Sequence, residues 1–180
     1  QDYDGLLLVK NERIIKENVR YITGFTGSTA YVIVTPQQRI LITDDRYIDQ
    51  AKEECPEFEI VRYENPYTKK LLEVLKELKL KKIGYEIHGI TIGIYNKLKN
   101  KLEGIDLVGT ENIIESLRAI KNADEIRLIK KAAEIASESF KYILPFFKPE
   151  VKEKDIALEF EFNMRKNGAE GLAFDLILCS

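Results

Sequence analysis

The sequence lacks most of what the common catalytic centres require. Its 180 residues include one histidine, two cysteines and no tryptophan. With His88 alone, a zinc or two-metal site built from several histidines cannot be assembled within the chain. Ser/His/Asp and Cys/His catalysis would both depend on that same residue, and no Gly-x-Ser-x-Gly motif occurs. We therefore expect His88, beside Gly89, to be a loop or capping residue.

Further absences narrow the class of protein. Cys55 and Cys179 lie far apart in the chain, which favours neither a disulfide framework nor a cysteine-rich zinc site and is typical of the cytoplasm. The longest apolar runs, such as Gly5–Val9, are far too short to cross a bilayer, so we expect no membrane association. A net charge of −2 argues against a nucleic acid as the partner, because nucleic-acid binders usually carry basic stripes.

Strand and helix signals alternate through the first part of the chain, which favours an α/β fold. We expect strands at 5–9, 29–35, 39–43, 58–63, 82–85 and 105–108, and helices at 11–18, from 66 onward and at 92–102. The strands on either side of Pro36 should form a hairpin. Asn65 suits the N-cap of the helix that follows, and Pro66 suits its first position. This pattern predicts a mixed sheet flanked by helices.

Two long helices are expected after about residue 112, where we place a domain boundary. The first, 123–147, carries apolar residues at alternating spacings of three and four, and Pro145 should end its last turn. Asn122 or Asp124 is expected to cap its start. The second, 153–167, should end at a C-cap near Gly168 and lead into a strand at 172–179.

Two local motifs have both a structural and a functional interpretation. The stretch from Gly24 to Ser28 has paired glycines but lacks the lysine and the spacing of a phosphate-binding loop, so a tight turn is favoured. Asp44 and Asp45 follow a strand, where two carboxylates can bind a cation. More often such a pair caps the next helix while an arginine such as Arg46 pairs with an acid, and we favour this structural interpretation.

Four motifs, in order, resemble the N-terminal portion of prolidases and Xaa-Pro aminopeptidases, which belong to the creatinase–aminopeptidase family with the pita-bread fold. They are Asn18-x-x-Tyr-Ile-Thr-Gly-Phe-Thr-Gly-Ser28, Thr43-Asp-x-Arg-Tyr47, Arg118-x-Ile-Lys121 followed by Glu125-Ile126, and Gly168-Ala-Glu-Gly-x-x-Phe-Asp-x-Ile-x-x-Ser180. The resemblance covers nearly the whole chain. It implies a creatinase-like N-terminal domain over 1–112 and the incomplete beginning of an α+β pita-bread catalytic domain over 113–180, so we expect the chain to be a truncated piece of a longer protein.

The resemblance also implies a cofactor. Members of the family hold two divalent metal ions, commonly manganese, cobalt or zinc, with two Asp, one His and two Glu. All of these positions come after Ser180, so the resemblance places no catalytic residue and no metal ligand in this chain. Asp175 matches a motif position that the family does not use as a ligand.

Phe174 and Ile177 are the two site residues that the resemblance assigns. They match apolar positions that line the pocket for the substrate's N-terminal side chain in prolidase-like members. Their spacing of three does not place them on one face of a regular strand, so a bulge or twist would be needed. The alternative interpretation is that both are core residues of a buried strand.

The implied activity is hydrolysis of Xaa-Pro bonds in proline-containing dipeptides or peptides by a cytoplasmic homodimer. In such a dimer the N-terminal domain would mediate dimerisation and restrict substrate length. Two alternatives are a creatinase-like hydrolase of a non-peptide C–N bond and a metal-free peptide- or histone-binding relative. We expect the 180-residue chain itself to be inactive, with exposed apolar helix stripes after residue 112 that promote association.

Overall fold

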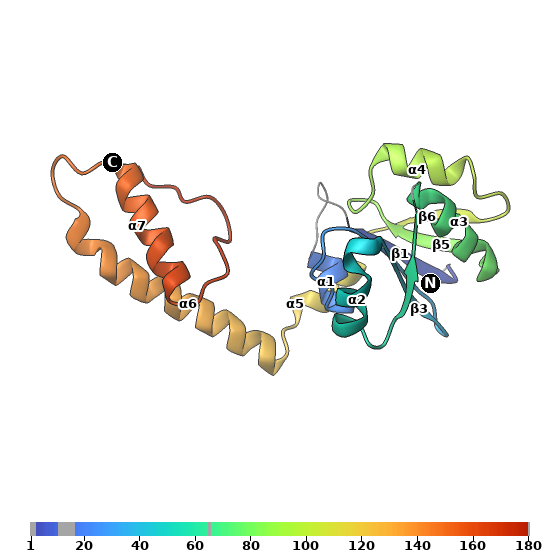
Figure 1. Ribbon diagram of the computed structural model, residues 1–180, viewed down its shortest axis with the longest axis horizontal. Coiled ribbons are helices and arrows are strands. Elements are labelled where there is room, and N and C mark those ends of the chain that lie inside the picture. Colours follow the sequence, from blue (N-terminus) through green and yellow to red (C-terminus); the bar gives the residue numbers. More distant parts are fainter. Residues whose placement is uncertain (1–2, 11–16, 65, 180) are drawn as a thin grey trace. The chain divides into compact units, whose positions relative to one another are not determined.

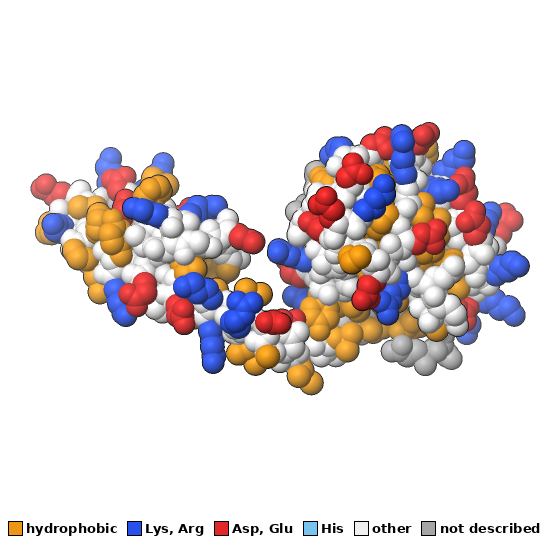
Figure 2. All heavy atoms as spheres, turned by 60° about the horizontal axis from the view of Figure 1, so that its bottom comes forward, with side chains coloured by type: hydrophobic (Ala, Val, Ile, Leu, Met, Phe, Trp, Pro, Cys, Tyr) orange, Lys and Arg blue, Asp and Glu red, His pale blue; other side chains and the backbone are white. Residues whose placement is uncertain are grey.

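The computed structural model describes residues 3–10, 17–64 and 66–179. The chain divides into two compact units, Gln1–Ala119 and Ile120–Ser180. Figure 2 shows acidic and basic side chains interspersed over the visible face, as the near-zero net charge suggests. Among the described residues, no helix is both long enough and apolar enough to span a membrane.

The first unit is built on a six-stranded sheet with the order β4-β3-β2-β1-β5-β6 (Figure 1). The strands are β1 (Gly5–Lys10), β2 (Ala30–Val34), β3 (Arg39–Thr43), β4 (Glu59–Arg62), β5 (Lys82–Glu86) and β6 (Asp106–Thr110). Only the pairs that involve β2 are antiparallel. The expected mixed sheet and the hairpin of β2 with β3 are confirmed.

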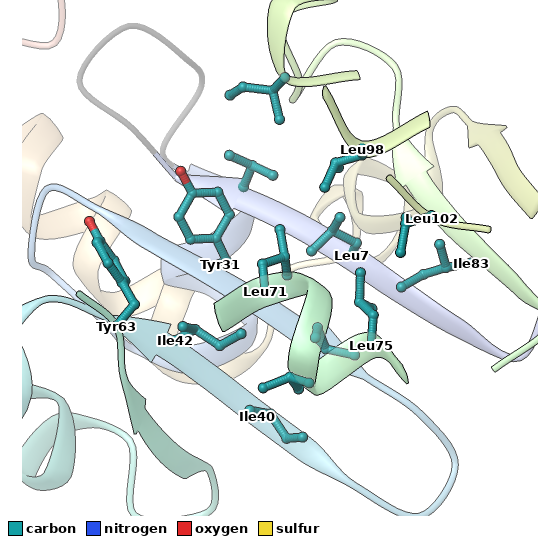
Figure 3. Packing of buried hydrophobic residues seen from close by; sticks show 14 residues of the cluster. Leu7, Tyr31, Ile40, Ile42, Tyr63, Leu71, Leu75, Ile83, Leu98 and Leu102 are labelled. Carbon is teal, nitrogen blue, oxygen red and sulfur yellow. The ribbon is translucent and has the colours of Figure 1, made fainter. Parts of the chain in front are cut away.

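Helices cover both faces of this sheet, and β1 is therefore buried on both sides. Leu7 and Val9 face a cluster with α3 (Tyr67–Glu77) and α4 (Ile92–Lys99), part of which Figure 3 shows. Leu6 and Leu8 face the opposite cluster with α1 (Glu17–Thr23), α2 (Ile48–Glu54) and α5 (Ile113–Ala119). A continuous apolar run is what a strand between two helix layers requires.

Helix boundaries in the first unit differ from expectation at three places. The helix expected at 11–18 falls mostly outside the described residues, and the described helix α1 continues to Thr23 because Val19 is buried against the sheet. The N-cap of α3 is Pro66, one residue later than expected, and Asn65 lies outside the described residues. Helix α4 ends at Lys99 rather than at Leu102.

The second unit consists of α6 (Ala123–Ile143), a short 3-10 helix at Leu144–Phe146 and α7 (Glu153–Lys166). Asn122 caps α6 in a reciprocal capping box with Glu125, and Pro145 lies where the α-helix ends, as predicted. The two helices pack on each other through the rings of Phe140 and Phe160, whose centroids are 6.4 Å apart.

One expectation for this unit is wrong for the chain as it stands, and another is confirmed. The predicted strand at 172–179 is irregular, because no strand lies beside it among the described residues to supply a hydrogen-bonded ladder. The expected exposed apolar stripe is present on α6, where Ile126, Ile129 and Phe140 are about half exposed and Ile143 is buried. Ile135 and Ser139 are the other buried residues of α6.

The two compact units divide after Ala119, whereas the sequence pattern placed a boundary near residue 112. Residues 113–119 form α5, and its Ile114 is buried in the cluster that includes Val19 of α1. Helix α5 therefore packs as part of the first unit.

Candidate functional site

The segment after α7 carries the two predicted substrate-contacting residues. Gly168 closes α7 with a φ of +99°, and the Ala169 amide donates to the Met164 carbonyl at 3.1 Å. Downstream of this cap, Phe174 is 74% exposed and Ile177 is 84% exposed. In this chain they are exposed apolar side chains of an irregular segment, and their role in a substrate pocket stays a prediction.

The Gly24–Ser28 motif is the loop between α1 and β2, with a bend at Gly27 and Ser28, which agrees with its structural interpretation. Gly24 adopts a φ of +80°, a conformation that favours glycine. Glu54 of α2 fixes Thr26, accepting hydrogen bonds from the Thr26 amide at 2.7 Å and the Thr26 hydroxyl at 2.6 Å. Burial opposes ionisation of Glu54, but these hydrogen bonds outweigh it and lower the pKa of its carboxyl.

Asp44 also has the structural role that was favoured for it. Its carboxylate caps the 3-10 helix at Asp45–Tyr47 by accepting from the Arg46 amide at 3.1 Å, and it accepts two guanidinium bonds from Arg46 at 2.9 Å. The hydrogen bond from the Arg46 side chain is the main reason that the pKa of Asp44 is lowered. Arg46 forms the ion pair with Asp44. The helix cap and this ion pair account for the position of the Asp44 carboxylate.

His88 lies in the loop after β5, where its side chain is 78% exposed and its Nε2 is 3.9 Å from Glu111 Oε1. The position agrees with the expected loop role. Both residues border a cavity of about 30 Å³, enough for about one water molecule, at the carboxyl ends of β5 and β6. Among the described residues, no three His, Cys, Asp or Glu side chains converge in a way that could hold a metal ion.

A polar cluster around the buried Asn18, beside this cavity, was not predicted from the sequence. We define the Asn18 cluster as the side chains joined by the Asn18 amide, which are Asn18, Glu86, Glu115 and Arg118. Asn18 and Arg118 belong to two of the motifs noted above, but their separation of 100 residues gave no local signal that they meet. Helix α1, the end of β5 and helix α5 bring the four together.

Residues 1–120 match the family model of the Creatinase/Prolidase N-terminal domain, and residues 127–180 match that of Metallopeptidase family M24. The uncharacterized peptidase YqhT of Bacillus subtilis is 36% identical over 98% of this chain and 49% of its own length. The Xaa-Pro dipeptidase of Pyrococcus horikoshii is 30% identical over 98% of this chain and 48% of its own length.

Solved structures agree with these sequence matches. The Xaa-Pro dipeptidase from Bacillus anthracis has a TM-score of 0.89 and 34% identity over 96% of this chain and 47% of that one. The X-Pro aminopeptidase from Thermotoga maritima also has a TM-score of 0.89, with 31% identity over 96% of this chain and 49% of that one. The chain thus spans about half the length of the relatives it matches. The Creatinase/Prolidase N-terminal domain model covers two thirds of the residues, and the M24 match follows it in the chain. The chain therefore belongs to the creatinase/prolidase family.

Proposed function

We propose that this chain is part of an exopeptidase that hydrolyses Xaa-Pro bonds. The observation that carries the proposal is the similarity to an Xaa-Pro dipeptidase over 98% of the chain, across both compact units. The succession of a creatinase/prolidase N-terminal match and an M24 match supports the same assignment.

The metal ions of such an enzyme do not fit the residues described in this chain. Metallopeptidase family M24 implies divalent metal ions, yet no cluster of three suitable ligands occurs among the described residues. We therefore propose that a manganese, cobalt or zinc pair is held by residues of the whole protein outside this chain. On this proposal the 180-residue chain alone hydrolyses no Xaa-Pro dipeptide.

The chain's own contribution would be positioning. We assign the first unit to dimerisation of a cytoplasmic homodimer and to restriction of substrate length. Phe174 and Ile177 would line the pocket for the substrate's N-terminal side chain, and both side chains are exposed in this chain. Burial of such side chains against a substrate contributes binding and orientation rather than proton transfer.

The deciding experiment uses the whole protein encoded by the gene of this chain. It is assayed on Xaa-Pro dipeptides after removal of metal and again after addition of manganese, cobalt or zinc, with Xaa-Ala dipeptides as matched controls. Metal-dependent cleavage confined to the Xaa-Pro series is expected. Cleavage of creatine but not of dipeptides would establish the creatinase-like alternative, and tight peptide binding without turnover would establish the metal-free alternative.

The pocket assignment is tested in the same assay. Phe174→Ala should raise KM for dipeptides with a large N-terminal side chain by roughly tenfold while changing kcat little, because about 1–3 kcal/mol of apolar contact is lost. Glycyl-proline, which has no such side chain, is the matched control substrate. An equal loss for both substrates would assign Phe174 to the protein core instead.

A further inference from the structure

The Asn18 side chain is held by charged groups from three different elements. Asn18 is only 3% exposed. Its Nδ2 donates to Glu86 Oε1 and to Glu115 Oε1, each at 2.6 Å. Its Oδ1 accepts from Arg118 Nη1 at 2.7 Å. Both amide hydrogens and the amide oxygen are therefore engaged, and all three partners are at least 68 residues away in sequence.

This geometry forces two carboxylates together. Because both accept from the same nitrogen, the two Oε1 atoms lie no more than about 5 Å apart. Two like charges at that separation in a partly buried site favour retention of a proton on one of them. The cluster thus resembles a carboxyl pair more than two independent surface glutamates.

The surroundings make the two carboxyls unequal. Burial raises the pKa of Glu86, and the charge of Glu115 raises it further, against the hydrogen bond from Asn18 and the charge of Arg118. The hydrogen bond from Asn18 lowers the pKa of Glu115, with help from Arg118. The other charged groups at the site are His88 and Glu111, which border the same cavity and lie near each other. Glu86 therefore takes up a proton first when the pH falls.

Helix α5 is attached to the rest of the first unit by few contacts. It has seven residues, too few for a stable helix in isolation, and its apolar contacts are those of the buried Ile114 and the partly buried Ile113. Its remaining contacts with the first unit include the Glu115 and Arg118 bonds and a 3.5 Å bond from the Tyr21 hydroxyl to the Leu117 carbonyl. The chain passes from α5 through residues 120–122 directly into α6.

We infer that the Asn18 cluster is a proton-sensitive clasp that fixes helix α5 to the rest of the first unit. The clasp is tightest when the carboxyl pair holds one proton. The contribution of Glu86, whose pKa is raised, is present at low pH and is lost as the pH rises through its folded-state value. The contribution of Glu115, whose pKa is lowered, is present at higher pH and is lost as the pH falls through its folded-state value. Attachment of α5 is therefore maximal between the two titrations.

The test measures hydrogen–deuterium exchange of the α5 amides from about pH 4 to about pH 9, corrected for the intrinsic exchange rate, on the 180-residue chain. In wild type, the protection factors of the α5 amides should fall as the pH rises above the point of maximal attachment. The fall should be on the order of tenfold for each pH unit by which the pKa of Glu86 is raised. Glu86→Gln keeps a carbonyl acceptor for Asn18 but has no charge, so it should abolish that alkaline loss. Glu111→Gln, at the same cavity but outside the cluster, should behave as wild type.

Two outcomes would overturn the clasp. One is the same alkaline loss in Glu86→Gln as in wild type, and the other is abolition of that loss by Glu111→Gln. A second measurement needs no variant: carboxyl ¹³C titration of the wild-type protein should give a raised value for Glu86 and α5 amide shifts that follow the same transition. If Glu86 and Glu115 titrate as independent, ordinary glutamates, the clasp does not exist.

Discussion

Replacement of Gly27 by alanine should destabilise the first unit through crowding against aromatic rings. A Cβ at this position would lie 2.9 Å from Phe25 Cε1 and 2.9 Å from Tyr47 Cδ1, and closer still to Phe25 Cζ. Phe25 cannot move aside, because it is fully buried and meets Tyr47 edge-on at 5.9 Å. Overpacking of this kind costs about 1–3 kcal/mol, which corresponds to a fall in Tm of roughly 4–12 °C for a unit of this size.

Urea unfolding followed by near-ultraviolet circular dichroism would measure this change. Eight of the nine tyrosines lie within residues 1–119 and the chain has no tryptophan, so the signal reports almost entirely on the first unit. Gly104→Ala is the matched control: Gly104 has a φ of +77° and nothing within 4 Å of an added Cβ, so its cost of about 1 kcal/mol comes from the backbone alone.

A second substitution separates the two causes. Replacing the Phe25 ring with the smaller side chain of leucine should relieve the crowding. The double variant Phe25→Leu/Gly27→Ala should therefore lose less free energy of unfolding than the sum of the two single variants, by about 1 kcal/mol. The combination of Phe25→Leu with Gly104→Ala should be additive. Additivity in both pairs would refute the steric explanation for Gly27.

Three further predictions concern groups with assigned partners. Glu54→Gln should remove a stabilisation that, because the pKa of Glu54 is lowered, is present near neutral pH and lost as the pH falls; urea unfolding against pH should show the two proteins converging in acid. Asp44→Ala should cost about 1 kcal/mol as the N-cap is lost, whereas Asp44→Asn, which keeps a capping oxygen, should cost less in the same assay. Asn122→Ala should weaken the start of α6 by about 1 kcal/mol, seen as faster hydrogen exchange at Glu125 and its neighbours, with no change in the first unit.

Local patterns were sufficient for most of the secondary structure and for the family. The continuous apolar run of β1, the hairpin turn at Pro36 and the capping box at Asn122 act over a few residues, so neighbouring sequence determines them. The same holds for Asp44, whose cap and arginine partner are two residues away. The ordered motifs then indicated a creatinase/prolidase relative, which the comparisons confirm.

Only the tertiary structure decided which distant groups meet. It placed α5 with the first unit, because Ile114 finds its apolar partners there, and it left 172–179 irregular, because a strand needs a neighbour to pair with. It also brought Asn18 to Arg118 across 100 residues and forced two glutamates onto one amide. Hydrogen-bond partners at such separations follow from how the sheet and its helices stack, and no local pattern in the sequence encodes that stacking.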